Sequence, residues 1–164
     1  MAFYAPAPAP GDIRVMVWFA GCGGEAQGIA VIPGVSLHLA ANHWRTAIES
    51  HAANFPHVDH QIGDIRELPV HDWPVCEFFW ASPECTNFSS AKGVPAHFAN
   101  ADTIPGLEPE VDEAAERSRA LMWDIPRYLD GVIRRGKRVL AGVVENVVEA
   151  SRAAQFPAWC KDMA

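Results

Sequence analysis

Short apolar runs alternate with segments of helical periodicity along most of the chain. The runs predict strands at residues 13–19, 35–41, 58–62, 75–80 and 138–144. Between and after them, the pattern predicts helices at about 25–31, 44–54, 111–134 and 148–155. Strands that alternate with helices favour a mostly parallel sheet with right-handed crossovers. The pattern therefore predicts an α/β fold.

The longest predicted helix, 111–134, has an apolar stripe and one proline. Leu121, Ile125 and Leu129 recur every fourth residue, so we expect them on one buried face. Pro126 lies inside the segment and predicts a kink, because proline removes a helical hydrogen bond.

Two stretches lack periodicity. Residues 5–10 alternate alanine and proline, which predicts a flexible Pro/Ala tail over 1–12 in front of one domain covering 13–164. Residues 83–109 are rich in proline, glycine, serine and asparagine. A long irregular stretch inside a domain is a functional loop or a disordered one, and both alternatives stay open here.

Composition narrows the class of protein. Of the 164 residues, 49% are hydrophobic and 20% charged, which is typical of a globular domain. The formal net charge of −7 argues against strong generic binding to a phosphate backbone, which needs clustered lysine and arginine. A nucleic-acid ligand would need locally concentrated basic residues, or basic residues supplied by a partner.

The cysteines and termini indicate the compartment. The four cysteines are widely spaced and form no CxxC pair: Cys22, Cys76, Cys85 and Cys160. This favours a reducing, intracellular setting. With no leader pattern and no run near the ~18 apolar residues of a membrane span, we expect a cytoplasmic protein with no membrane partner. We interpret His57 and His60 as surface groups rather than metal ligands, and expect no metal.

Each predicted strand is followed by a glycine or polar cluster. These are Gly21–Gly24, Asn42-His43, Asp64, Ser82–Cys85 and Glu145-Asn146. In open parallel sheets, ligands bind beyond the carboxyl ends of the strands, so the clusters would meet along one edge. The sequence therefore predicts a ligand site there.

The glycine cluster is the first candidate binding element. Gly21, Gly23 and Ala26 fit the dinucleotide pattern G-x-G-x-x-G/A, in which the backbone approaches the ligand closely. That pattern expects an acidic residue about 20 positions later, where this chain has Asn42-His43. The missing acid weakens the case for an NAD-dependent oxidoreductase, and a plain tight turn is the simpler alternative.

Cys85 is the candidate nucleophile. It follows a strand and opens the irregular segment, where a thiol would be exposed and movable. An isolated cysteine is more often an inert core residue, and the neighbouring Glu84 should oppose thiolate formation. We interpret the other three cysteines as structural.

Two carboxylates follow strands. Asp64 is equally compatible with a helix cap and with a contact to an adenine amino group. Glu145 ends an apolar strand, and an apolar setting would favour its protonated, hydrogen-bond-donating form. The simpler alternative there is a helix cap by Asn146.

Taken in order, the clusters resemble the first half of the cytosine-5 DNA methyltransferases, over residues 13–157. The glycine motif that binds S-adenosylmethionine in that family is matched by Phe19, Ala20, Gly21, Cys22, Gly23 and Gly24. The segments around the cofactor's ribose and adenine are matched by His43, Trp44, Asp64 and Ile65. The nucleophile loop is matched by Ser82 to Cys85, and the ENV motif by Glu145, Asn146 and Val147.

The resemblance implies a Rossmann-like class I methyltransferase fold, incomplete at its C-terminus, with S-adenosylmethionine as cofactor and double-stranded DNA with a flipped cytosine as partner. It implies that Cys85, Glu145 and Asn146 are catalytic, and that Ser82 lies with the cofactor-binding residues. The chain departs from the family pattern at Val17, His43 and Glu84, where that pattern has two acidic residues and a proline.

The family continues with further segments that read DNA, which are not in this sequence. We therefore expect the chain to be a partial catalytic domain that needs a second polypeptide carrying the target recognition region. The alternative is a non-enzymatic remnant that binds the cofactor or another protein.

Overall fold

The computed structural model describes residues 7–84 and 121–163, without the side chain of Leu121, and the account below concerns these residues. They fall into two compact units. The described part of the first unit covers 7–82 and 127–145, and that of the second covers 83–84, 121–126 and 146–163. Cys85, most of the predicted irregular segment, the first half of the helix predicted at 111–134 and part of the predicted tail lie outside the described residues.

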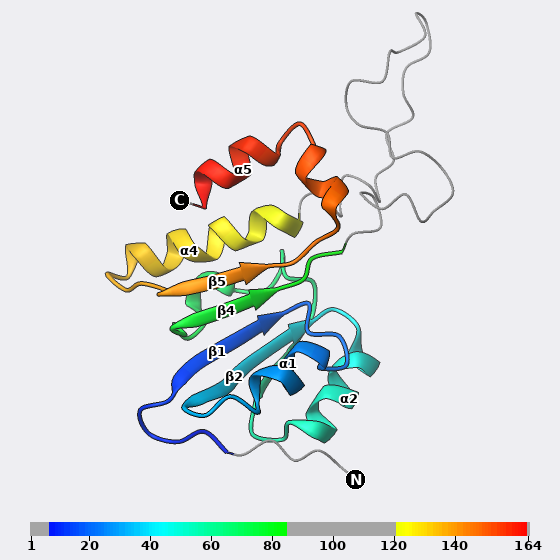
Figure 1. Cartoon of the computed structure of the whole chain (residues 1–164), viewed down its shortest axis with the longest axis vertical. Coiled ribbons are helices and arrows are strands. Elements are labelled where there is room, and N and C mark those ends of the chain that lie inside the picture. Colours follow the sequence, from blue (N-terminus) through cyan, green and yellow to red (C-terminus); the bar gives the residue numbers. More distant parts are fainter. Residues whose placement is uncertain (1–6, 85–120, 164) are drawn as a thin grey trace, which may run out of the picture. The chain divides into compact units, whose positions relative to one another are not determined.

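The first unit is built on a five-stranded, entirely parallel sheet (Figure 1). Its strands are β1 (Ile13–Trp18), β2 (Val35–Asn42), β3 (Asp59–Ile62), β4 (Phe78–Ala81) and β5 (Ala141–Val144), in the spatial order β3-β2-β1-β4-β5. The chain winds outward from β1 to β3 and then returns to the other side of β1. This is the doubly wound, Rossmann-like methyltransferase fold, which confirms the predicted fold class.

Helices cover both faces of the sheet, because β1 is apolar on both sides. Val15 and Val17 share one cluster with residues of α1 (Gly24–Ile29) and with Phe55, which follows α2 (Arg45–Asn54). On the other face, the Trp18 ring makes an edge contact with Tyr128 of α4 (Asp124–Arg134), with ring centroids 5.2 Å apart. Both Val17 and Trp18 are essentially inaccessible to solvent. β1 is therefore the centre of the core.

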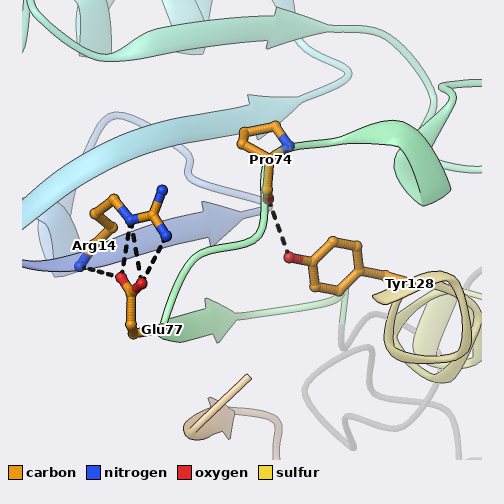
Figure 2. Close-up of polar contacts among 4 residues, drawn as sticks. All are labelled: Arg14, Pro74, Glu77 and Tyr128. Atoms are coloured by element: carbon orange, nitrogen blue, oxygen red, sulfur yellow. Dashed lines mark hydrogen bonds and ion pairs between the residues drawn. The ribbon is translucent and has the colours of Figure 1, made fainter. Parts of the chain in front are cut away.

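Two polar contacts fix the amino side of this unit (Figure 2). The Arg14 guanidinium donates to both carboxylate oxygens of Glu77, with Nη2 2.6 Å from Oε1. This ties β1 to the residue before β4, and the hydrogen bonds from Arg14 lower the pKa of Glu77 to about 2. The Tyr128 hydroxyl donates to the Pro74 carbonyl at 3.2 Å, and burial raises the pKa of that phenol to about 12.

Two strands are shorter than predicted. β4 begins at Phe78 rather than at residue 75, and β5 begins at Ala141 rather than at residue 138. The two strands pair residue for residue, from Phe78 with Ala141 to Ala81 with Val144. A strand extends only as far as its neighbours offer backbone partners, and β4 pairs with β1 over the same residues, so apolar sequence alone overestimated both lengths.

The helices after β4 also differ from the prediction. α4 begins at Asp124, after a 3-10 turn at Leu121–Trp123, so Pro126 lies in the first turn and no kink is needed. The face of α4 that is buried carries Ile125, Tyr128 and Val132, whereas Leu129 is only half-buried.

The prediction of a helix at 148–155 is wrong. Val148–Arg152 forms a 3-10 turn, and α5 runs over Phe156–Asp162, with a proline in its first turn. Proline starts a helix but does not continue one, which divides the segment at this point. A minor 3-10 turn in the first unit spans Val70–Asp72. None of the helices within 7–84 and 121–163 is long and apolar enough to cross a membrane.

The contact between Gly142 and Phe79 gives a test of the sheet packing. A Cβ atom on Gly142 would overlap the Phe79 ring, which is 5% exposed. We expect Gly142→Ala to destabilise the protein by about 1–3 kcal/mol through overpacking, measured by urea unfolding. Gly28→Ala is the matched control, because a Cβ there meets nothing within 4 Å; it should be neutral or stabilising by up to about 1 kcal/mol. Equal effects of the two substitutions would contradict the packing.

Candidate functional site

The turn after β1 has unusual backbone geometry. Phe19 has φ 61°, in the left-handed region that bulky residues rarely adopt, and Gly21 and Gly23 have φ 50° and 95°. The loop closes on itself, since the Gly23 amide donates to the Ala20 carbonyl at 3.0 Å. Ala20 is buried, whereas Cys22 and Gly24 are exposed. Strained backbone of this kind is concentrated at functional sites.

Gly23 is also the point where the loop packs on α2. A Cβ on Gly23 would lie 2.7 Å from the Phe55 ring and 3.1 Å from the His51 ring. Only glycine fits this position, both for its φ and for this approach. The sequence pattern identified the glycine, but only the tertiary structure shows that it packs against His51 of α2 and Phe55.

His51 is a buried group that sequence reasoning missed. It is 0% exposed, and its Nδ1 lies 2.9 Å from Nε2 of His60 on β3. Burial, with a smaller contribution from His60, lowers the pKa of His51 to about 4, so the ring is neutral at pH 7. The interpretation of His60 as a surface group is wrong, because it is half-buried against His51. His57 is exposed, as expected.

The segment after β2 is held by Asn42. Its side-chain oxygen accepts from the Trp44 amide at 2.8 Å, and its carbonyl accepts from the Gly63 amide at 3.1 Å. The end of β2 is thereby joined to the turn after β3. Trp44 is 58% exposed, so its indole is available to a ligand. His43 is exposed too, and lies near enough to Asp64 for its charge to affect that carboxyl.

Asp64 organises the turn after β3. Its Oδ1 accepts from the Arg66 amide at 3.0 Å and from Arg66 Nε at 2.8 Å, and its other oxygen pairs with the same guanidinium. The hydrogen bonds from Arg66 lower the pKa of Asp64 to about 2, so the carboxylate is ionised. Ile65 beside it is buried, which makes it part of the core rather than an exposed ligand contact.

The segments after β4 and β5 are tied together twice. In the first unit, the Glu145 amide donates to the Ala81 carbonyl at 2.9 Å. In the second unit, the Asn146 side-chain amide donates to the Pro83 carbonyl at 3.2 Å. Pro83 lies two residues before Cys85, whose own position is outside the described residues. Ser82 accepts from Trp80 Nε1 at 3.0 Å, which orients its hydroxyl.

Two expectations for this region need correction. Glu145 is exposed rather than enclosed by apolar side chains. Strand β5 is at the edge of the sheet as the structure describes it and is itself largely exposed, so its apolar sequence did not imply burial. Asn146 does not cap the following turn either: its Oδ1 accepts from the Val147 amide at 2.8 Å, and its amide reaches Pro83.

The remaining cysteines differ in exposure. Cys76 is buried, and desolvation raises the pKa of its thiol to about 11, as fits a structural residue. Cys22 and Cys160 are exposed, so their interpretation as structural residues is wrong.

A hollow in the first unit lies away from the strand ends just described. Its volume is about 310 Å³, including space open to solvent, and Ala30, Ser36, Phe55 and Val58 are among the residues that line it. Ser36 is the second residue of β2, so this hollow lies at the amino end of that strand. Ligands of open parallel sheets bind instead at the carboxyl edge, where the strained loop, Trp44 and Asp64 lie.

Comparison with known proteins supports the fold. No protein-family model and no curated protein matches the sequence. A solved structure of an E. coli prophage-encoded protein, inferred to be a DNA modification methyltransferase, superposes with a TM-score of 0.60 and 21% sequence identity. The match covers 92% of this chain and 36% of that one, so this chain spans about a third of its neighbour's length. The YcgJ protein from Bacillus subtilis matches at a TM-score of 0.34 and 19% identity, over 52% of this chain and 38% of that one, which is too weak to argue from.

The buried histidine predicts a pH dependence of stability. The folded-state pKa of His51 is lowered from 6.5 to about 4, so the unfolded chain binds the proton more tightly. The contribution of His51 to the free energy of unfolding is therefore fully present above pH 6.5. It is lost as the pH drops towards 4, which lowers the free energy of unfolding by up to roughly 3 kcal/mol. Urea unfolding across this range measures the effect.

The nontitrating variant His51→Phe should flatten this part of the profile. His57→Gln, at an exposed position, is the control and should leave the profile as in the parent protein. A His51→Phe profile with the parental slope would show that burial of His51 is not the cause.

Proposed function

We propose that this chain is the cofactor-binding and nucleophile-bearing part of an S-adenosylmethionine-dependent DNA methyltransferase that modifies C5 of cytosine. The observation that carries the proposal is the hydrogen bond from Asn146 to the Pro83 carbonyl. Within the second unit it joins Pro83, two residues before Cys85, to Asn146 of the proposed catalytic motif. The methyltransferase fold and the strained loop after β1 support the same interpretation.

The described residues fit the proposed cofactor. Gly21 and Gly24 leave the main chain open, because an added Cβ at either position would meet nothing within 4 Å. This gives a methionine moiety close access to the backbone. The exposed Trp44 indole offers a face for adenine, and the ionised Asp64 offers an acceptor for its amino group. Phe19, Ala20, Cys22, Gly23 and Ser82 complete the proposed binding set through backbone position.

The catalytic roles follow from the chemistry of cytosine. C5 is too weak a nucleophile to take a methyl group, so the Cys85 thiolate adds to C6 of a base flipped out of the duplex. Glu145 accepts from the cytosine amino group, and in its protonated form it donates to N3 and offsets the negative charge that develops there. Asn146 holds its loop against Pro83. The bound cofactor supplies an electrophilic methyl group. Loss of the C5 proton and of the Cys85 bond then releases the methylated base.

Three departures from the family pattern define what is particular to this chain. Val17 is 0% exposed in the core of β1, where an acidic residue would be desolvated. His43 offers a single ring acceptor to the ribose hydroxyls, where a carboxylate offers two oxygens. Glu84 is exposed beside the nucleophile and should disfavour its thiolate. Together they predict weaker cofactor binding and slower chemistry than the family pattern gives.

The proposal includes two partners. One is double-stranded DNA with a flipped cytosine, and the other is a second polypeptide carrying the target recognition region. The chain spans only about a third of the length of its structural neighbour, which supports the need for further residues. The net charge of −7 also favours a partner that supplies the basic contacts to phosphate.

Cofactor binding is tested by protection of Cys22. This thiol is exposed in the strained loop, so bound S-adenosylmethionine should slow its alkylation by iodoacetamide several-fold at saturation. Cys160 is exposed on α5 and serves as the internal control, whose rate should not change. Mass spectrometry of the tryptic peptides reads both rates in one sample. Protection by NADH instead of S-adenosylmethionine would assign the site to an oxidoreductase, and protection by neither would refute the cofactor site.

Catalysis is tested by trapping the enzyme on DNA. Duplex DNA with 5-fluorocytosine cannot lose the C5 substituent as a proton, so the Cys85 bond to C6 persists after methyl transfer. We expect a cofactor-dependent covalent complex on a denaturing gel when a polypeptide that carries a target recognition region is added. Cys85→Ser should abolish the complex, and Cys160→Ser should retain it. If the parent chain forms no complex with or without that polypeptide, the proposed catalysis is refuted and the alternative of a non-enzymatic remnant is favoured.

A further inference from the structure

Arg127 of α4 contacts the turn after β3 through a paired hydrogen bond. Its Nη2 donates to the Ile65 carbonyl at 2.7 Å, and its Nη1 donates to the Arg66 carbonyl at 3.1 Å. The two acceptors are consecutive carbonyls, and a planar guanidinium holds such a pair in one orientation. Bonds from a charged donor are also stronger than those between neutral groups.

The turn that Arg127 holds is the one that presents Asp64. On its N-terminal side, the Gly63 amide donates to the Asn42 carbonyl at 3.1 Å. On its C-terminal side, the Asp64 carboxylate accepts from the backbone amide of Arg66. The carboxylate is thus directed by the same backbone whose carbonyls Arg127 grips. Displacement of these carbonyls would move the carboxylate with them.

We infer that Arg127 is a positioning residue that gives Asp64 its selectivity for the adenine amino group. The inference rests on the proposed function, in which the site at the carboxyl edge takes S-adenosylmethionine. Asp64 is ionised and acts only as an acceptor, so it favours a 6-amino purine and repels a 6-oxo purine. This discrimination requires the carboxylate within hydrogen-bond distance of position 6, because a small displacement removes the contact.

Arg135, in the turn that follows α4, provides a matched control. It donates to the Trp73 carbonyl at 2.9 Å and to the Gly131 carbonyl at 3.1 Å. It therefore makes the same kind of guanidinium-to-carbonyl contacts as Arg127. Neither of its acceptors belongs to the turn of Asp64, so the two arginines separate positioning from general support of the fold.

The experiment compares two ligands by calorimetry on the full chain: S-adenosylhomocysteine and its 6-oxo counterpart, S-inosylhomocysteine. We expect the parent protein to bind the amino ligand about tenfold or more tightly than the oxo ligand. This is the difference that one hydrogen bond to a charged group produces. Arg127→Gln should lower this ratio at least about threefold, chiefly by weakening the amino ligand. Arg127→Lys, which keeps the charge and one donor direction, should recover part of the ratio. Arg135→Gln should keep the parental ratio.

The outcomes separate the inference from the proposed function. If the parent protein binds neither ligand, the proposed function is refuted and the inference falls with it. If the parent discriminates and Arg127→Gln keeps the ratio, or loses affinity equally for both ligands, the proposed function stands and the positioning role is refuted. Should Arg127→Gln unfold, as judged by its melting temperature, the ratio of Arg127→Lys decides: an unchanged parental ratio refutes the role and a reduced one supports it.

Discussion

The structure depends on parallel backbone pairing on both sides of β1. Val15 pairs with Leu37 of β2 on one side and with Phe78 of β4 on the other. Because both neighbours run in the same direction as β1, the chain must cross over a face of the sheet between strands, and the helices cover both faces. The same parallel pairing brings every strand end to one edge. The core and the candidate site are therefore two consequences of a single arrangement.

At that edge, main-chain geometry does most of the positioning. Phe19 and the glycines after it turn the chain sharply away from β1, and Gly23 presses the turn onto His51 and Phe55. A bulky residue with positive φ and a histidine buried in its neutral form are both unfavourable in isolation. They persist because the surrounding packing holds them, and this is the condition under which a loop keeps a fixed shape for a ligand.

The charged contacts at this edge are confined to one turn, although the chain as a whole carries a net negative charge. Asp64 is ionised and paired with Arg66, and Arg127 binds the carbonyls of the same turn. Two guanidinium groups thus converge on one short turn in a chain of net charge −7. Such a concentration fits a site that must hold one carboxylate in a defined direction. It does not create a broad basic surface for DNA, which accords with the proposed need for a second polypeptide.

The sequence by itself determined the fold class and the order of the candidate elements. Apolar runs with helical segments between them predict parallel strands. Gly21, Asp64 and Glu145 each follow such a run, so a parallel sheet places them at the same edge. The apolar runs and the residues that follow them are short-range patterns, so they can be recognised in the sequence alone. Strand lengths were less predictable, since the ends of β4 and β5 depend on each other rather than on their own composition.

Only the tertiary structure decided which side chains meet. His51 and His60 are nine positions apart and carry no local signal of pairing, yet His51 Nδ1 lies 2.9 Å from His60 Nε2. In the sequence, Arg127 is one charged residue of a helix among several. In the structure it donates hydrogen bonds to carbonyls more than sixty positions earlier in the chain. Glu145 reads as buried from its apolar strand, but that strand lies at the sheet's edge and the carboxylate is exposed. Periodicity records which face of an element is apolar; the partner against each face is set by long-range packing.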